Sequence, residues 1–269
     1  MIKQKVLLMI SKMKYSKLKH ILFLVVWLVL PMLSFGNDQA QALFAKGNAF
    51  YSKAQYKEAL TTYQQILGEG YQSAALYFNL GNAYYKSDDT PSALLYYEKA
   101  HKLAPGDEDI NYNIRFANLK TVDKIDEAPE FFLANWWKAF ILSFSVGTLT
   151  VLSIVLVALA SVVLIVYFFA NSVSIKKSSF YASILLFFLG VLTVFMAGMQ
   201  ISYFDNHRQA IIFASSVTIK SGPIEKSGSL FVLHDGTKVN ILENNNGWMK
   251  IRLGNGNEGW IKARDIKEI

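Results

Sequence analysis

The stretch Gly47-Asn48-Ala49-Phe50-Tyr51 recurs 34 residues later as Gly81-Asn82-Ala83-Tyr84-Tyr85. This repeat decides the fold of residues 37–126. Farther along each copy, Ala59, Leu60 and Tyr63 align with Ala93, Leu94 and Tyr97. A period of about 34 residues is typical of stacked helix-turn-helix units, in which a small residue lets paired helices cross closely and an aromatic residue fills the adjoining gap. We therefore expect an α-helical repeat domain at 37–126, with units at 40–73 and 74–107.

Both units resemble the tetratricopeptide repeat. The second copy carries the expected residue types at Tyr77, Leu80, Gly81, Tyr84, Ala93, Tyr97, Ala100 and Pro105. The first matches at Leu43, Gly47, Phe50, Ala59 and Tyr63, and departs at Lys46, Ile66 and Tyr71. Two units alone bury too little apolar surface, because each unit hides its apolar face only against a neighbour. The run 107–124 is expected to supply a capping helix.

The first helix of each unit predicts a binding groove. Residues spaced i, i+3 or i+4 share one helix face, and first helices line the concave surface of a stacked repeat. The predicted groove residues are Phe44, Asn48, Tyr51, Phe78, Asn82 and Tyr85. The asparagines would hydrogen-bond an extended peptide backbone beside aromatic walls. Repeats that clamp a C-terminal carboxylate need lysine where this chain has Phe44 and Phe78, which argues against a clamp. Alternatively, some of these aromatics merely pack against the cap.

The chain also carries membrane signals. Residues 1–36 combine six lysines, an apolar run and a small-residue cleavage pattern ending at Gly36, which predicts a signal peptide starting at Met1 or Met13; an uncleaved anchor is the alternative. Two uncharged apolar stretches predict transmembrane helices at 148–170 and 180–203. The linker 127–147 contains an aromatic lead-in that predicts an interfacial helix.

The charges predict one topology. The loop 171–179 carries Lys176 and Lys177 and no acid, so the positive-inside rule places it in the cytoplasm. Segments 37–135 and 205–269 then both lie outside, in agreement with the leader. Neither predicted span contains a charged residue or histidine, which indicates an anchor in the lipid bilayer and not a carrier.

Beyond residue 205 the apolar period changes to alternation. Five short runs rich in Val, Ile, Phe and Trp, separated by turn residues, predict a small barrel at 205–269. The stretch 230–239, followed by Gly247-Trp248-Met249-Lys250-Ile251 and Gly259-Trp260-Ile261, resembles the bacterial SH3-like domain. Some relatives bind cell-wall peptides, which makes Phe231, Trp248 and Trp260 candidate ligand contacts. The alternative is that these rings fill a small core and shield its edges.

The composition and the short motifs argue against several kinds of catalytic, metal and nucleic-acid site. The absence of cysteine excludes disulfides, thiolate metal sites and a cysteine nucleophile, and the four scattered histidines suggest no metal site. Residues 254–259 satisfy G-x-G-x-x-G but lie between short strands, where a hairpin turn is expected. Residues 1–36 contribute +6 of the net charge of +7, so no broad basic face remains for nucleic acid. We expect no catalytic residues, no metal, no cofactor and no enzymatic activity.

The combined prediction is a multi-domain membrane protein with an α-helical tetratricopeptide repeat domain, a two-helix transmembrane hairpin and a small all-β SH3-like barrel. This order resembles the BatE family of the Bacteroidetes aerotolerance operon. The resemblance implies a scaffold in the cell inner membrane, with both domains in the periplasm, partnered by Bat proteins that carry von Willebrand factor A-type domains and linked to aerotolerance and oxidative stress. A peptidoglycan sensor acting through the SH3-like domain is the alternative.

Overall fold

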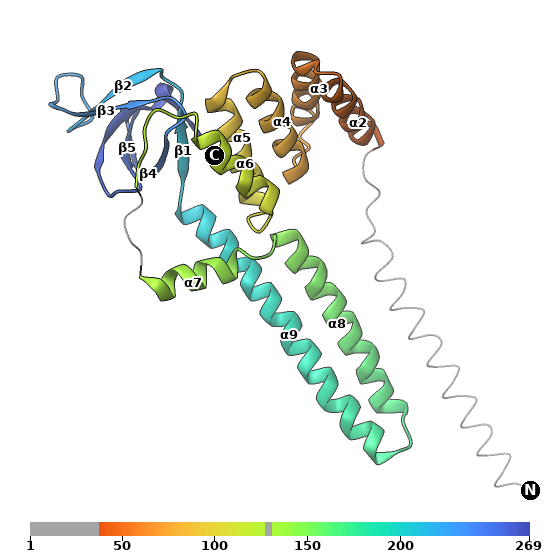
Figure 1. Cartoon of the computed structure of the whole chain (residues 1–269). Coiled ribbons are helices and arrows are strands. Elements are labelled where there is room, and N and C mark those ends of the chain that lie inside the picture. The colour runs from red at the N-terminus through yellow and green to blue at the C-terminus, as the bar shows by residue number, and fades with distance from the viewer. Residues whose placement is uncertain (1–37, 127–130) are drawn as a thin grey trace, which may run out of the picture. The chain divides into compact units, whose positions relative to one another are not determined.

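The computed structural model describes residues 38–126 and 131–269 (Figure 1). The predicted signal peptide at 1–36 and part of the predicted linker, 127–130, lie outside the described residues. The chain divides into two compact units. One contains Gly147–Gly198, and the other joins the described parts of Asn37–Val146 to Met199–Ile269.

Four helices form the two expected helix pairs: α2 (Asp38–Ser52) with α3 (Tyr56–Gly68), and α4 (Ala74–Lys86) with α5 (Thr90–Leu103). The crossings have the predicted chemistry, because a Cβ on Gly47 would overlap the ring of Tyr63 and one on Gly81 the ring of Tyr97. The side chain of Asp89 caps α5 by accepting from the Ser92 amide.

The helix after the second pair, α6 (Glu108–Asn118), is shorter than the cap expected at 107–124. Asp107 caps its start by accepting from the amides of Asp109 and Ile110. Its end is closed by Lys124, whose Nζ donates to the carbonyls of Asn118 and Leu119. Residues 119–126 therefore leave the helix and form a connecting segment.

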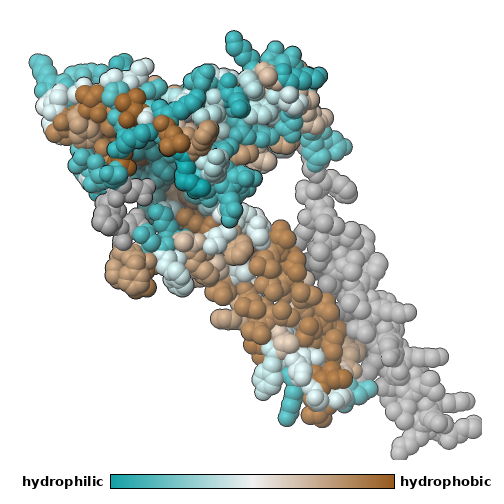
Figure 2. Space-filling view, in the orientation of Figure 1, coloured by the Kyte–Doolittle hydropathy of each residue, from teal (hydrophilic) through white to brown (hydrophobic). Residues whose placement is uncertain are grey.

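Two helices are long and apolar enough to cross a membrane: α8 (Val146–Phe169) and α9 (Val173–Asn206). A mostly hydrophobic surface covers these helices in Figure 2. The predicted loop 171–179 is wrong in extent, because α9 begins at Val173 and includes Lys176 and Lys177. Lysine is a good helix former, and its long side chain can reach the interface from within a helix. Between the two helices Gly190 allows close approach, since a Cβ there would lie 2.9 Å from Cγ2 of Val157.

The amphipathic segment before the two apolar helices forms α7 (Phe132–Ile141), which belongs to the same compact unit as the repeat. Exposed aromatic side chains dominate its surface.

The C-terminal segment has seven strands where the sequence pattern predicts five. They are β1 (Gln209–Ile212), β2 (Ser216–Lys220), β3 (Ser229–His234), β4 (Lys238–Asn245), β5 (Trp248–Arg252), β6 (Glu258–Lys262) and β7 (Ile266–Glu268), with a short 3-10 helix at Ala263–Asp265. The sheet order is β3-β2-β6-β5-β4-β1-β7, and every pair is antiparallel. The apolar run 210–220 contains two strands and not one, because the chain turns between Ile212 and Ser216.

The sheet packs directly on the helical repeat (Figure 1). Ile211 of β1 is 1% exposed and shares a core with Leu94, Tyr97 and Ala117 of α5 and α6. A helical stack needs a cover for its last apolar face. Here the cover includes a strand that follows both apolar helices in sequence, so segments on either side of α8 and α9 build one core.

Candidate functional site

A cavity of about 500 Å³ lies beside the first helix pair, and two of the six predicted groove residues line it. Phe44 and Asn48 of α2 line it together with Ile66, Tyr71 and Leu76. Tyr71, which departs from the family pattern, is 41% exposed and forms part of the wall. The cavity is mostly apolar, with the asparagine as one of its polar groups.

Asparagine side chains link neighbouring helices along the repeat. Oδ1 of Asn48 accepts hydrogen bonds from the hydroxyl of Tyr63 at 2.7 Å and from Nδ2 of Asn79 at 2.9 Å. One repeat later, Oδ1 of Asn82 accepts from the hydroxyl of Tyr97 and from Nδ2 of Asn113, both at 2.8 Å. We call these four asparagines the asparagine ladder. It ties the first helix of each unit to its own second helix and to the next first helix.

In each asparagine of the ladder, one of the two polar atoms of the side-chain amide takes no part in the ladder hydrogen bonds. Among the described residues, Nδ2 of Asn48 and Asn82 and Oδ1 of Asn79 and Asn113 have no hydrogen-bond partner. Each step therefore offers one donor and one acceptor. The predicted asparagines thus have a structural role, which sequence reasoning missed, as well as atoms that a ligand could use.

The tyrosines of the ladder remain protonated donors. Burial raises the pKa of Tyr63 to about 12, and burial also raises the pKa of Tyr97. Their hydroxyl groups consequently keep donating to Asn48 and Asn82 at any physiological pH.

The predicted aromatic walls are half-buried. Phe44 lies with its ring centroid 6.0 Å from Tyr63, and Phe78 lies 5.9 Å from Tyr97. Tyr51 contacts Tyr56 at 5.4 Å. Phe44, Tyr51 and Phe78 thus contact a ring on the second helix of their own unit, whereas the ring centroid of Tyr85 lies 5.5 Å from Phe116 of α6.

Helix α6 extends the concave face with residues that the sequence analysis did not select. One further repeat period beyond Phe78, Asn82 and Tyr85 lie Tyr112 and Phe116 of α6 and Leu119 directly after it, which are 58%, 44% and 72% exposed. The rings of Tyr112 and Phe116 stack at 6.0 Å. Sliding the repeat period once more would have found them, because α6 is the first helix of a third unit that is not completed.

Two of the three candidate rings lie on the outer face of the barrel. On β5 and β6, Met249, Gly259 and Ile261 face inward, which puts Trp248 and Trp260 on the outer face, half-buried. Cross-strand neighbours are Trp248 with Lys262 and Trp260 with Lys250. Phe231 instead packs against the barrel core. Phe231 therefore fits the interpretation of these rings as core, while the half-buried rings of Trp248 and Trp260 are compatible both with shielding the edges of the core and with contacting a ligand.

Side chains also join the repeat to the barrel. The carboxylate of Asp123 accepts from the backbone amide of His234 at 2.7 Å, from its Nδ1 at 3.0 Å and from the Thr237 hydroxyl at 2.7 Å. Burial alone would raise the pKa of Asp123, but the hydrogen bonds from His234 and Thr237 outweigh burial and lower it. Glu98, only 4% exposed, pairs with Lys238 at 2.8 Å.

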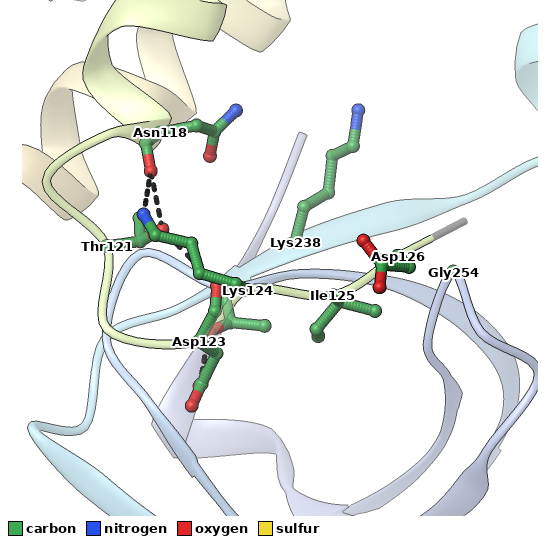
Figure 3. A pocket seen from close by; sticks show the side chains of 9 residues that line it. Asn118, Thr121, Asp123, Lys124, Ile125, Asp126, Lys238 and Gly254 are labelled. Carbon is green, nitrogen blue, oxygen red and sulfur yellow. Dashed lines mark hydrogen bonds between the residues drawn. The ribbon is translucent and has the colours of Figure 1, made fainter.

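A polar cavity of about 360 Å³ lies at this junction, between the segment after α6 and the barrel (Figure 3). Figure 3 shows Lys124 folded back onto the carbonyl of Asn118. Asp123 and Lys238 on the cavity wall are also paired with other residues. The charged groups at this cavity therefore stabilise the junction. No cluster of potential metal ligands is present within 38–126 and 131–269.

Comparison with known proteins identifies both modules. Residues 32–105 match the family described as Tetratricopeptide repeat, and residues 215–267 match the family described as Bacterial SH3 domain. The chain therefore contains a tetratricopeptide repeat segment and a bacterial SH3 domain. No curated protein matches it.

Two solved structures are similar to about a quarter of the chain each. One is an NlpC/P60 family protein from Bacillus cereus, 18% identical with a TM-score of 0.20, covering 26% of this chain and 23% of that chain. The other is the C-terminal SH3 domain of myosin IB from Entamoeba histolytica, 30% identical with a TM-score of 0.18, covering 24% of this chain and 95% of that chain. Both scores are too low to carry an argument about function.

Proposed function

We propose that this protein is a membrane-anchored scaffold that binds an extended segment of a partner protein in its repeat groove and has no catalytic role. The asparagine ladder is the observation that supports the proposal. Its unused atoms form one donor and acceptor pair at Asn48 and Asn79 and another at Asn82 and Asn113.

The spacing of these pairs suits a peptide backbone. Packed helices lie about 8–10 Å apart, and an extended chain rises about 3.3 Å per residue, so one step of the ladder corresponds to roughly three residues of peptide. Each peptide unit supplies one N–H and one C=O, which match the acceptor and donor of one step. The exposed aromatic rings on α6 would then contact side chains at one end of the bound segment.

The shared core of repeat and barrel supports the hairpin topology. Both segments flank α8 and α9, and two segments that pack on one another must lie on the same side of a membrane. An even number of spans between them satisfies this condition. With the leader and the lysines at the start of α9, this favours the periplasmic side of the inner membrane.

The order of modules further supports a role of the BatE type. On that proposal the partners are membrane proteins of the Bat group with von Willebrand factor A-type domains, and the complex contributes to aerotolerance. The anchor would raise the effective concentration of a captured partner for further contacts at the membrane.

The test uses substitutions that change the groove but keep the ladder. In Asn48→Asp with Asn82→Asp, each side chain still has an oxygen to accept from tyrosine and asparagine, while the outward donor becomes an acceptor. We expect crosslinking of partner proteins in native membranes to fall roughly tenfold or more. The control Tyr97→Phe removes a ladder hydrogen bond and no groove atom, so partner capture should persist. Undiminished capture by the double variant would rule out the groove.

The outer face of the barrel supports a second candidate, a peptidoglycan-binding sensor. Trp248 and Trp260 alternate there with Lys250 and Lys262, and the ammonium group of Lys262 lies 5.6 Å from the Trp248 ring centroid. Aromatic rings beside cations suit a ligand with apolar faces and carboxylates, which would take the place of Glu258 at Lys250 and of Glu225 at Lys262. Full-length protein should then sediment with purified peptidoglycan, and Trp248→Ala with Trp260→Ala should abolish this. Equal sedimentation of the variant would exclude this face.

A further inference from the structure

A separate cavity of about 550 Å³ lies between the repeat and α7, outside the groove and the barrel face. His101 and Gly106 form one wall, and Asn135, Lys138 and Ser143 contribute to the other. The two walls meet tightly at one end, because a Cβ on Gly106 would overlap the backbone carbonyl of Ser143. The turn after α5 therefore rests on the C-terminal end of α7.

One residue of the cavity wall, His101, carries a buried polar atom. Nδ1 of His101 is buried and has no hydrogen-bond partner among the described residues. Burial lowers the pKa of His101, and the charges of Lys238 and Lys138 lower it further, while Glu98 and the adjacent side chain of Asn111 oppose the lowering. A neutral imidazole still has one N–H to donate, and leaving a buried polar atom unpaired costs free energy.

The helix that forms the second wall has the surface of a membrane-interface helix. Phe132, Trp136 and Phe140 are 69%, 65% and 42% exposed. The aromatic helix ends at Ile141, and α8 begins only a few residues later at Val146. Aromatic rings concentrate at the level of lipid headgroups, so a cavity lined by this helix would lie at the depth of the lipid phosphates.

We propose that this cavity binds the headgroup phosphate of an anionic glycerophospholipid, with Lys138 and His101 as its ligands. Lysine offers up to three N–H donors and a full charge, and the imidazole of His101 can supply a further hydrogen bond. The rings of α7 would lie beside the glycerol and the first acyl carbons. The site rests on the membrane anchoring proposed above but does not depend on the peptide groove.

Native mass spectrometry of the full-length protein in detergent, titrated with phosphatidylglycerol or phosphatidylcholine, tests the site. We expect one phosphatidylglycerol to be retained in preference to phosphatidylcholine. Lys138→Gln should weaken its binding roughly tenfold, while Lys138→Arg keeps the charge and should retain it. Lys177→Gln, a matched control at an exposed position of α9, should change binding by less than about twofold.

Several outcomes would overturn the assignment. Equal weakening by Lys138→Gln and Lys177→Gln would show only general attraction to anionic lipid. Displacement of the lipid by excess inorganic phosphate, dependent on Lys138, would assign the site to a soluble anion. Absence of lipid selectivity in folded Lys138→Arg and wild type would exclude a lipid site. A failure of the membrane anchoring is a different result, because carbonate would then extract the chain from membranes without detergent.

Discussion

Asp123 concentrates three hydrogen bonds between the repeat and the barrel on one carboxylate. Asp123→Ala leaves the His234 amide and the Thr237 hydroxyl unpaired in a partly buried junction. We expect the free energy of unfolding to fall by about 2–4 kcal/mol. Urea unfolding of the full-length protein in detergent would measure the loss. Asp126→Ala is the matched control, because Asp126 is an exposed acid in the same segment, and it should cost less than about 0.5 kcal/mol.

The same carboxylate predicts a pH dependence. The pKa of Asp123 is lower in the folded state than the usual value of about 3.9, so its contribution is complete above that value and is lost as pH falls through the folded pKa. Wild type should therefore lose more stability between about pH 5 and about pH 3 than Asp123→Asn, as measured by urea midpoints. Identical slopes for the two proteins would contradict the lowered pKa, and Asp126→Asn should retain the wild-type slope.

For single residues, the sequence predicts a role where the residue recurs with the repeat period. It does not predict a role for a residue outside that pattern. The groove positions of Asn48 and Asn82 follow from helix spacing, and Tyr112 and Phe116 follow from one further shift by the repeat period. Asp123 could not be predicted, because its partner His234 is 111 residues away beyond two apolar helices. An isolated acid in a connecting segment carries no local signal of a long-range contact.

Between elements, the close crossing of α4 and α5 depends on Gly81. A Cβ at this position would overlap the ring of Tyr97, which is 2% exposed and held by the ladder. We expect Gly81→Ala to destabilise the protein by about 1–3 kcal/mol, although alanine is the better helix former. Denaturant unfolding followed by circular dichroism would measure this.

Gly68 provides the matched control, because it ends α3 and a Cβ there meets nothing within 4 Å. Gly68→Ala should be neutral or should stabilise by up to about 1 kcal/mol. A similar loss in both variants would show that helix propensity and backbone effects, and not the crossing, determine the cost.

The elements themselves are predictable where a period persists. The four repeat helices and the two apolar helices follow from periods and from long uncharged runs. Errors arise where the pattern is short: the segment after Asn118 continues an apolar pattern without helix, and the run 210–220 hides a turn. The last strand, β7, has only three residues and exists because β1 offers an edge for it to pair with.

For the whole molecule, the shared core of repeat and barrel restricts the topology. Residues on opposite sides of the hairpin, such as Leu94 and Ile211, are buried together. We therefore expect a labelling reagent that cannot cross membranes to reach exposed sites in both domains from the same side of the membrane. Sites at the start of α9 should be reached only from the other side.

The absence of cysteine allows a direct test, because a single introduced thiol is the only one in the chain. Lys53→Cys in the repeat and Asn255→Cys in the barrel should react with an impermeant maleimide in intact spheroplasts, whereas Lys177→Cys should react only after permeabilisation. If the first two variants were protected and Lys177→Cys were labelled in intact spheroplasts, both domains would lie on the cytoplasmic side, and the two-helix hairpin would remain. Labelling of only one domain would contradict the shared core itself, since no arrangement of spans lets packed domains lie on opposite sides of a bilayer.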